Sequence, residues 1–138
     1  MEMKLELVTL PVTDVDRAKA FYADRLGFHV DVDHQAGETF RVVQLTPPGS
    51  ACSIAVGVGI TDAEPGSVRG LHLVVSDIVA TRDALAERGA DVGAIRHMGP
   101  NGWVEGPHPE RSDYNSFAEL QDPDGNVLLL QERGHHTG

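Results

Sequence analysis

The chain is poor in the residues that most restrict a protein's location and partners. Cys52 is its single cysteine, so no disulfide can form within the chain. We expect Cys52 to be a small hydrophobic residue in an apolar strand rather than a reactive thiol, and the protein to lie in a reducing cytoplasm. Lys and Arg total 11 against 21 Asp and Glu, a net charge of −10, which disfavours nucleic acid and anionic membrane surfaces as partners. No run approaches the ~18 apolar residues of a membrane span, so we expect neither membrane insertion nor export.

Aromatic residues are also few: one Trp, two Tyr and four Phe. Phe21, Tyr22 and Phe28 belong to the first expected helix and its exit. Three of the other four lie in or beside residues 97–115, a segment rich in Gly and Pro and much longer than an ordinary connection between elements. Those four aromatic residues are Phe40, Trp103, Tyr114 and Phe117.

What the chain does contain is an internal repeat. Residues 7–14, LVTLPVTD, align without a gap with residues 70–77, GLHLVVSD. Each segment is typical of a strand that runs into a helix, because Asp14 and Asp77 can accept a hydrogen bond from an amide of the first helical turn. Apolar residues follow both aspartates at helical spacing, which predicts a helix in each half.

A glycine ends each of these helices, Gly27 in the first half and Gly89 in the second, because glycine adopts the left-handed conformation without strain. Alternating apolar segments then predict strands at 28–34, 40–46 and 51–58, and at 91–96, 116–121 and 127–132. We therefore expect an α+β fold in which tandem β-α-β-β-β modules form a half-open, barrel-like sheet around a central cleft. The modules span 1–60 and 70–133 of a single domain, with a linker at 61–69 and a flexible tail at 134–138.

Two long segments, LVTLPVTDVDRAKAFYADRLGF at 7–28 and FAELQDPDGNVLLLQE at 117–132, resemble the vicinal oxygen chelate superfamily. That superfamily includes glyoxalase I, extradiol dioxygenases, fosfomycin-resistance enzymes and bleomycin-resistance proteins. The resemblance covers nearly the whole chain and implies the tandem-module fold and a homodimer. For the enzymes of the family it also implies a divalent metal held in the cleft.

The resemblance places four potential metal ligands on the first and last strands of the two halves, at Leu7, Ser53, Gly70 and Leu129. None of them carries a carboxylate or an imidazole, although a metal site of this kind needs about three such donors. His72 lies two residues beyond Gly70 on the same face of its strand, but its counterpart in the repeat is Thr9. We therefore expect no metal, and the sequence indicates no other cofactor.

Other signs of catalysis are missing from the sequence. It contains neither a nucleophile elbow nor a phosphate-binding glycine loop. His97 and His108 fall in the expected loop at 97–115 and are interpreted as solvated surface residues. We therefore predict no catalytic residue.

Bleomycin-resistance proteins, which the metal-poor pattern resembles, hold a drug without converting it. We predict a metal-independent protein that sequesters a flat, largely apolar aromatic natural product or antibiotic, for self-resistance or as a carrier. Trp103 would stack on such a ligand, or would instead anchor its loop. The predicted ligand-binding residues are Leu7, Thr9, Phe40, Gln44, Ser53, His72, Trp103, Tyr114, Phe117 and Leu129.

Two other functions are compatible with the sequence. One is a glyoxalase-like lyase, isomerase or dioxygenase with a non-standard or absent metal site, in which His72 or Glu119 acts as general base. The other is a regulatory or scaffolding module whose cleft is vestigial.

Overall fold

The computed structural model describes residues 1–136. The chain forms two compact units: unit 1 comprises Met1–Val68 and Asp122–Asn126, and unit 2 comprises Arg69–Gln121 and the chain from Val127 onward. Each unit has a helix and its own sheet, and neither sheet closes into a barrel, which confirms the predicted α+β class.

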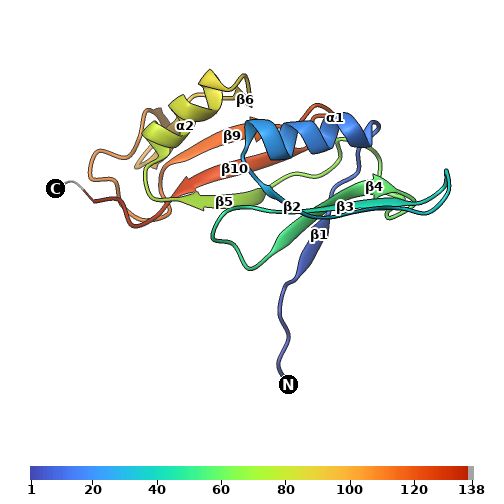
Figure 1. Cartoon of the computed structure of the whole chain (residues 1–138). Helices are drawn as coiled ribbons and strands as arrows, with labels where there is room; N and C mark the ends of the chain where they lie inside the picture. Colours follow the sequence, from blue (N-terminus) through green and yellow to red (C-terminus); the bar gives the residue numbers. More distant parts are fainter. Residues whose placement is uncertain (137–138) are drawn as a thin grey trace. The chain divides into compact units, whose positions relative to one another are not determined.

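Unit 1 contains β1 (Leu7–Thr9), α1 (Val15–Ala20), the π-helical turn η1 (Phe21–Arg25), β2 (His29–Gln35), β3 (Arg41–Thr46) and β4 (Ser53–Val58). Unit 2 contains β5 (Leu71–Val75), α2 (Ile78–Glu87), β6 (Asp91–Val92), β7 (Arg96–Gly99), β8 (Gly102–Glu105), β9 (Phe117–Gln121) and β10 (Val127–Glu132) (Figure 1).

The sheet of unit 1 has the strand order β1-β4-β3-β2. β1 runs parallel to β4, and the other pairs are antiparallel. One face of this sheet packs against α1 and η1 and forms the core of unit 1. Leu45 and Val56 point to that face and are fully buried. Because strand side chains alternate, Leu7, Thr9 and Gln44 point to the opposite face, which no helix of unit 1 covers.

Both predicted helix starts and both predicted stops are confirmed. The carboxylate of Asp14 accepts a hydrogen bond from the amide of Arg17 at 3.0 Å, and that of Asp77 accepts one from Ala80 at 3.1 Å. Gly27 and Gly89 have φ angles of 76° and 81°, in the left-handed region that favours glycine. The first helix changes to π geometry before it ends, with a hydrogen bond from the Leu26 amide to the Phe21 carbonyl at 3.1 Å.

The polar turn 122–126 connects β9 to β10 but belongs to unit 1. The buried hydroxyl of Tyr22 donates to Asp122 at 2.8 Å. The side-chain amide of Asn126, fully buried, donates to the Pro11 carbonyl at 2.9 Å and accepts from the Val68 amide at 3.1 Å. The turn is polar because its side chains satisfy buried backbone groups of unit 1.

The sheet of unit 2 has the order β5-β10-β9-β7-β8, with β6 pairing with β9. Leu128 and Leu130 of β10 are each 1% exposed, and they lie on the face covered by α2, which Figure 1 shows above β9 and β10. Ile78 and Leu85 are the buried residues of that helix. Leu129 and Gln131 alternate with the buried residues along β10, so their side chains point to the other face of the sheet. We call this face the open face of unit 2.

The second half is more elaborate than the predicted β-α-β-β-β pattern. Residues 97–115 are not one long loop, because β7 and β8 form a hairpin in which Met98 pairs with Trp103 and Gly99 with Gly102. Strands of four residues are too short to give a clear hydrophobic period. The prediction of a single strand at 91–96 is likewise wrong, since β6 is short and β7 begins at Arg96.

Part of the predicted flexible tail is attached to unit 2. The amide of Gly134 donates to Asp113 at 2.8 Å, and Nδ1 of His135 lies 3.3 Å from the Ser76 carbonyl. Residues 137 and 138 of that tail lie outside the described residues. Within the described part of the chain, no helix is long and apolar enough to cross a bilayer.

Candidate functional site

The open face of unit 2 has Leu129 at its centre. In the strand register, Leu129 of β10 lies between His72 of β5 and Glu119 of β9. Leu129 is partly exposed, whereas Leu128 and Leu130 are each 1% exposed on the opposite face. The hydrocarbon side chain therefore lies on an accessible surface with a titratable group on either side.

Aromatic side chains continue this face toward β7 and β8. Trp103 is 51% exposed, and its ring meets that of Phe117 edge to face, with centroids 5.6 Å apart. The guanidinium carbon of Arg96 lies 4.5 Å from the centroid of the Trp103 ring, a cation–π geometry. Met98, 46% exposed, is the register partner of Trp103. We call Trp103, Phe117, Arg96 and Met98 the aromatic platform.

A chain of hydrogen bonds orders the polar side of the same face. Nδ1 of His72 lies 2.7 Å from Oε1 of Gln131, and Nε2 of Gln131 donates to the Tyr114 carbonyl at 3.1 Å. Tyr114 is half exposed and has a positive φ of 65°, and Arg133 lies 5.7 Å from its ring centroid. All five predicted site residues of unit 2, His72, Trp103, Tyr114, Phe117 and Leu129, thus lie on or beside this open face.

Four of the predicted residues of unit 1 share the helix-free face of its sheet. Leu7 pairs with Ser53 in the register of β1 and β4, and Thr9 and Gln44 both pair with Ala55. Ser53 is only 5% exposed, and its hydroxyl is 2.6 Å from that of Thr46. Phe40 lies apart from these four, just before β3, with its ring 6.4 Å from that of His34.

The positions that hold a metal in the enzymes of the resembled family offer no ligand set here. Leu7 and Leu129 present hydrocarbon, and the hydroxyl of Ser53 already bonds to Thr46. Gly70 has no side chain and a φ of +81°. These residues do not fit a divalent cation, which requires several nitrogen, oxygen or sulfur donors directed at one point.

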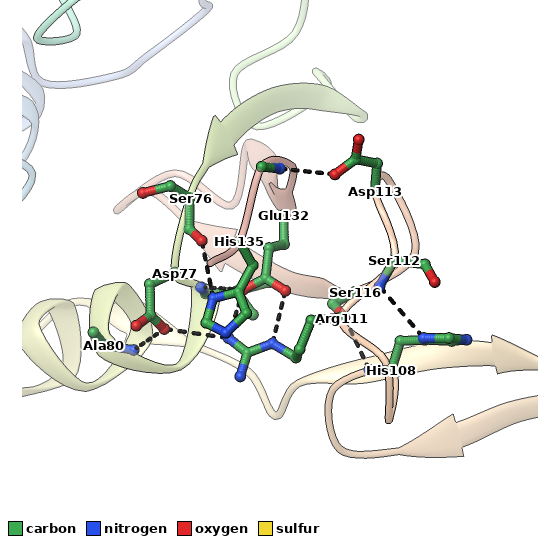
Figure 2. A network of polar contacts seen from close by, with 12 residues as sticks. Ser76, Asp77, Ala80, His108, Arg111, Ser112, Asp113, Ser116, Glu132 and His135 are labelled. Atoms are coloured by element: carbon green, nitrogen blue, oxygen red, sulfur yellow. Dashed lines mark hydrogen bonds and ion pairs between the residues drawn. The ribbon is translucent and has the colours of Figure 1, made fainter. Parts of the chain in front are cut away.

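One other group of potential ligands occurs within residues 1–136: ligand atoms of Asp77, Glu132 and His135 lie within 4.8 Å of one another. Figure 2 shows that Arg111 occupies this group. Its Nε and Nη2 donate to the two oxygens of Glu132 at 2.7 and 2.6 Å, and Nη2 also donates to Asp77 at 3.2 Å. The guanidinium already supplies the positive charge that a cation would bring.

This network has a structural role on the face away from Leu129. Glu132 is fully buried and accepts from the first amide of α2, that of Ile78, at 2.8 Å. Burial alone would raise the pKa of Glu132, but the hydrogen bonds from Arg111 and Ile78 outweigh it and hold the pKa below its ordinary value. The ion pair connects the segment 106–116 to the end of β10 and the start of α2.

Some features of the site were not predicted from the sequence. Arg96, Met98 and Gln131 belong to the open face but were not among the predicted residues. The turn residues are Pro100 and Asn101, between the paired Gly99 and Gly102. Pro followed by Asn is a common pair at the centre of a tight turn, and it would have placed Met98 opposite Trp103. The alternation along β10 would likewise have placed Gln131 on the same face as Leu129. His97, predicted to be solvated, is buried on β7, where Nδ1 lies 2.8 Å from the Gly106 carbonyl.

Known proteins share both the sequence pattern and this fold. The chain is 32% identical to TnmS3, an antibiotic binding protein from Streptomyces sp. CB03234, over 95% of this chain and 96% of that one, with a TM-score of 0.73. It is 33% identical to a glyoxalase/bleomycin resistance protein from the same organism, over 93% and 99% of the two chains, with a TM-score of 0.70. The uncharacterized protein YetH of Bacillus subtilis is 24% identical over 96% of this chain and 100% of its own length.

The family model that matches this chain extends over most of the two units. It is that of the Glyoxalase/Bleomycin resistance protein/Dioxygenase superfamily, and it matches residues 4–130. The match includes both capped helices and the complete aromatic platform. The chain belongs to the Glyoxalase/Bleomycin resistance protein/Dioxygenase superfamily.

Proposed function

We propose that this protein binds a flat, largely apolar aromatic small molecule, a natural product or antibiotic, and sequesters it without a metal and without converting it. The observation that carries the proposal is the aromatic platform on the open face of unit 2. Trp103 is half exposed there, although its ring packs edge to face with that of Phe117 and lies 4.5 Å from the guanidinium carbon of Arg96. A rigid aromatic surface of this kind stacks on a planar ligand at small entropic cost.

The apolar surface beside the platform favours the same class of ligand. Leu129 provides hydrocarbon at the position where family enzymes present a carboxylate, and Phe117 continues it toward Trp103. A lining that is mostly apolar, with a few fixed polar groups, is typical of small-molecule sites. The similarity to an antibiotic binding protein, at 32% identity over nearly the full length of both chains, supports an antibiotic as the ligand.

Fluorescence of Trp103, the only Trp in the chain, tests the proposal directly. We expect saturable quenching by members of a panel of fused-ring aromatic natural products and antibiotics. The matched control is a panel of aliphatic compounds of similar hydrophobicity, which should leave the emission unchanged. If no aromatic compound gives saturable quenching, the proposal is wrong.

Metal independence is a separate part of the proposal and needs its own measurement. The residues at the metal positions of the family offer no ligand set, so we expect purified protein to hold far less than one transition metal ion per chain. Ligand affinity should also be unchanged by dialysis against a chelator. A stoichiometric metal, or affinity lost with the metal, would contradict this part.

The alternative function is an enzyme with His72 or Glu119 as general base. It is favoured by one observation: these two titratable residues lie on either side of Leu129 on the open face, about 10 Å apart for two strand spacings. An enzyme with such a base would convert the bound molecule into a product, whereas a sequestering protein would release it unchanged. The mass spectrum of the ligand after incubation with the protein distinguishes the two functions.

We further propose that the protein acts as a homodimer in the cytoplasm. The dimer follows from the resemblance to bleomycin-resistance proteins, and the compartment from the single cysteine. Sedimentation equilibrium checks the dimer, and fractionation of cells that make the protein checks the compartment.

A further inference from the structure

The open face also indicates which functional group the ligand carries. We propose that Nε2 of His72 accepts a hydrogen bond from a hydroxyl group of the ligand, so that the protein selects hydroxylated aromatic compounds over their ethers. This inference rests on the proposed function, because it concerns the same open face. It goes further by assigning one specificity-determining residue and one chemical group.

The orientation of Gln131 is the first step. Its amide nitrogen lies 3.1 Å from the Tyr114 carbonyl oxygen. A carbonyl oxygen only accepts hydrogen bonds, so the NH2 group of Gln131 must face Tyr114. The amide oxygen of Gln131 is thereby directed at His72.

The tautomer of His72 follows from that orientation. Nδ1 of His72 is 2.7 Å from Oε1 of Gln131, and an amide oxygen has no hydrogen to donate. The hydrogen of this bond is therefore on Nδ1. In the neutral imidazole, the other nitrogen, Nε2, is then an acceptor.

The position of His72 makes this acceptor available to a ligand. His72 is exposed on β5 and lies beside Leu129 on the open face. A planar ligand that covers Leu129 displaces water from the imidazole. A hydroxyl on the ligand replaces the lost hydrogen bond, whereas an ether or an unsubstituted ring leaves Nε2 without a donor, and an acceptor left unpaired weakens binding.

Two small probes of the same shape test the assignment: 2-naphthol, which donates a hydrogen bond, and 2-methoxynaphthalene, which does not. Dissociation constants are measured by NMR chemical-shift titration at about pH 8, where an ordinary imidazole is neutral. We expect wild type to bind the naphthol about five- to tenfold more tightly. In His72→Leu the hydrogen-bond acceptor is gone, so the two dissociation constants should differ only by the effect of the extra methyl group of 2-methoxynaphthalene.

Gln131 is a positioning residue in this scheme, and a second variant tests that role. Gln131→Leu removes the acceptor that fixes the tautomer, so we expect the ratio of the two dissociation constants to fall toward that of His72→Leu. Gln121→Leu is the matched control, because Gln121 is exposed on the same sheet and pairs with Val127 rather than with His72. It should retain the wild-type ratio.

The tautomer has a readout that does not depend on any ligand. A long-range proton–nitrogen correlation spectrum of His72 should show a protonated Nδ1 and an unprotonated Nε2 in wild type. The opposite tautomer would overturn the inference. Equal affinity for the two probes, or failure of both to bind while compounds of the aromatic panel do bind, would overturn this inference and leave the proposed function intact. Failure of the probes and of the whole panel would overturn both.

Discussion

At the scale of single residues, Trp103 is the side chain on which the proposed binding should most depend. It is half exposed, yet its orientation is fixed by contacts with Phe117 and Arg96. A residue held in place before the ligand arrives loses little conformational entropy on binding.

Replacement of Trp103 by Ala should therefore reduce affinity more than stability. We expect about a tenfold loss of affinity for an aromatic ligand, measured by equilibrium dialysis. The free energy of unfolding should fall by less than about 1 kcal/mol, because Trp103 is not part of the core. Val104→Ala is the control, since Val104 is also half exposed but points to the other face of β8. Equal losses of affinity in the two variants would contradict the role of Trp103.

Glu132 has the opposite role, because it supports the fold and lies away from the open face. Among residues 1–136, Glu132→Gln leaves the partly buried guanidinium of Arg111 with only Asp77 as an anionic partner. We expect a loss of about 3 kcal/mol in the free energy of unfolding at neutral pH. Urea denaturation measures this loss. Glu105→Gln, at an exposed position of β8, should change the same quantity by less than about 0.5 kcal/mol.

The stabilisation by Glu132 also depends on pH. The pKa of Glu132 is lowered in the folded protein, so its stabilising contribution is present above the unfolded pKa of about 4.3 and is lost as the pH falls through the folded pKa. The difference in stability between wild type and Glu132→Gln should therefore shrink in acid. A difference that stays constant down to strongly acidic pH would contradict the assigned ion pair.

At the scale of elements, β10 shows how one strand serves two purposes. Its even-numbered residues, Leu128, Leu130 and Glu132, are buried against α2, and its odd-numbered residues, Leu129 and Gln131, belong to the open face. The run VLLLQE looks uniformly apolar in the sequence. The structure divides it into a buried core side and a side on the open face.

A pair of substitutions on β10 tests this division. Leu129→Glu should leave a folded protein, destabilised by about 1 kcal/mol or less because the residue is partly exposed, but should weaken binding of an apolar ligand. Leu130→Glu would bury an unpaired carboxylate and should prevent cooperative folding. Circular dichroism and thermal melting compare the two variants. If both were equally disruptive, Leu129 would be a core residue and not part of the site.

The elements that the sequence predicted well are those with strong local signals. The capping aspartates Asp14 and Asp77 and the glycines Gly27 and Gly89 each have a local physical cause, and all four were predicted correctly. The β7–β8 hairpin was missed because its strands are short and rich in polar residues and glycine. Ser53 was predicted to contact the ligand, but it is nearly completely buried. Its burial depends on the strands packed beside it, which the sequence around Ser53 does not indicate.

At the scale of the whole molecule, composition and fold restrict the function in different ways. The net charge of −10 disfavours strongly anionic ligands, and the fold is that of a superfamily containing both enzymes and binders. Fold alone does not decide between these functions. The decision depends on the site, where the positions at which the resembled enzymes hold a metal carry Leu7, Ser53, Gly70 and Leu129 and offer no ligand set.

The most direct test of the central claim is to recover the ligand after binding. Protein is equilibrated with the panel of aromatic natural products and antibiotics, separated from free compound, denatured, and the released compounds are identified by mass spectrometry. We predict that at least one planar aromatic compound is retained at near-stoichiometric amounts with its mass unchanged, and that Trp103→Ala retains much less of it. Release of a compound of altered mass, or retention of none, would contradict the account.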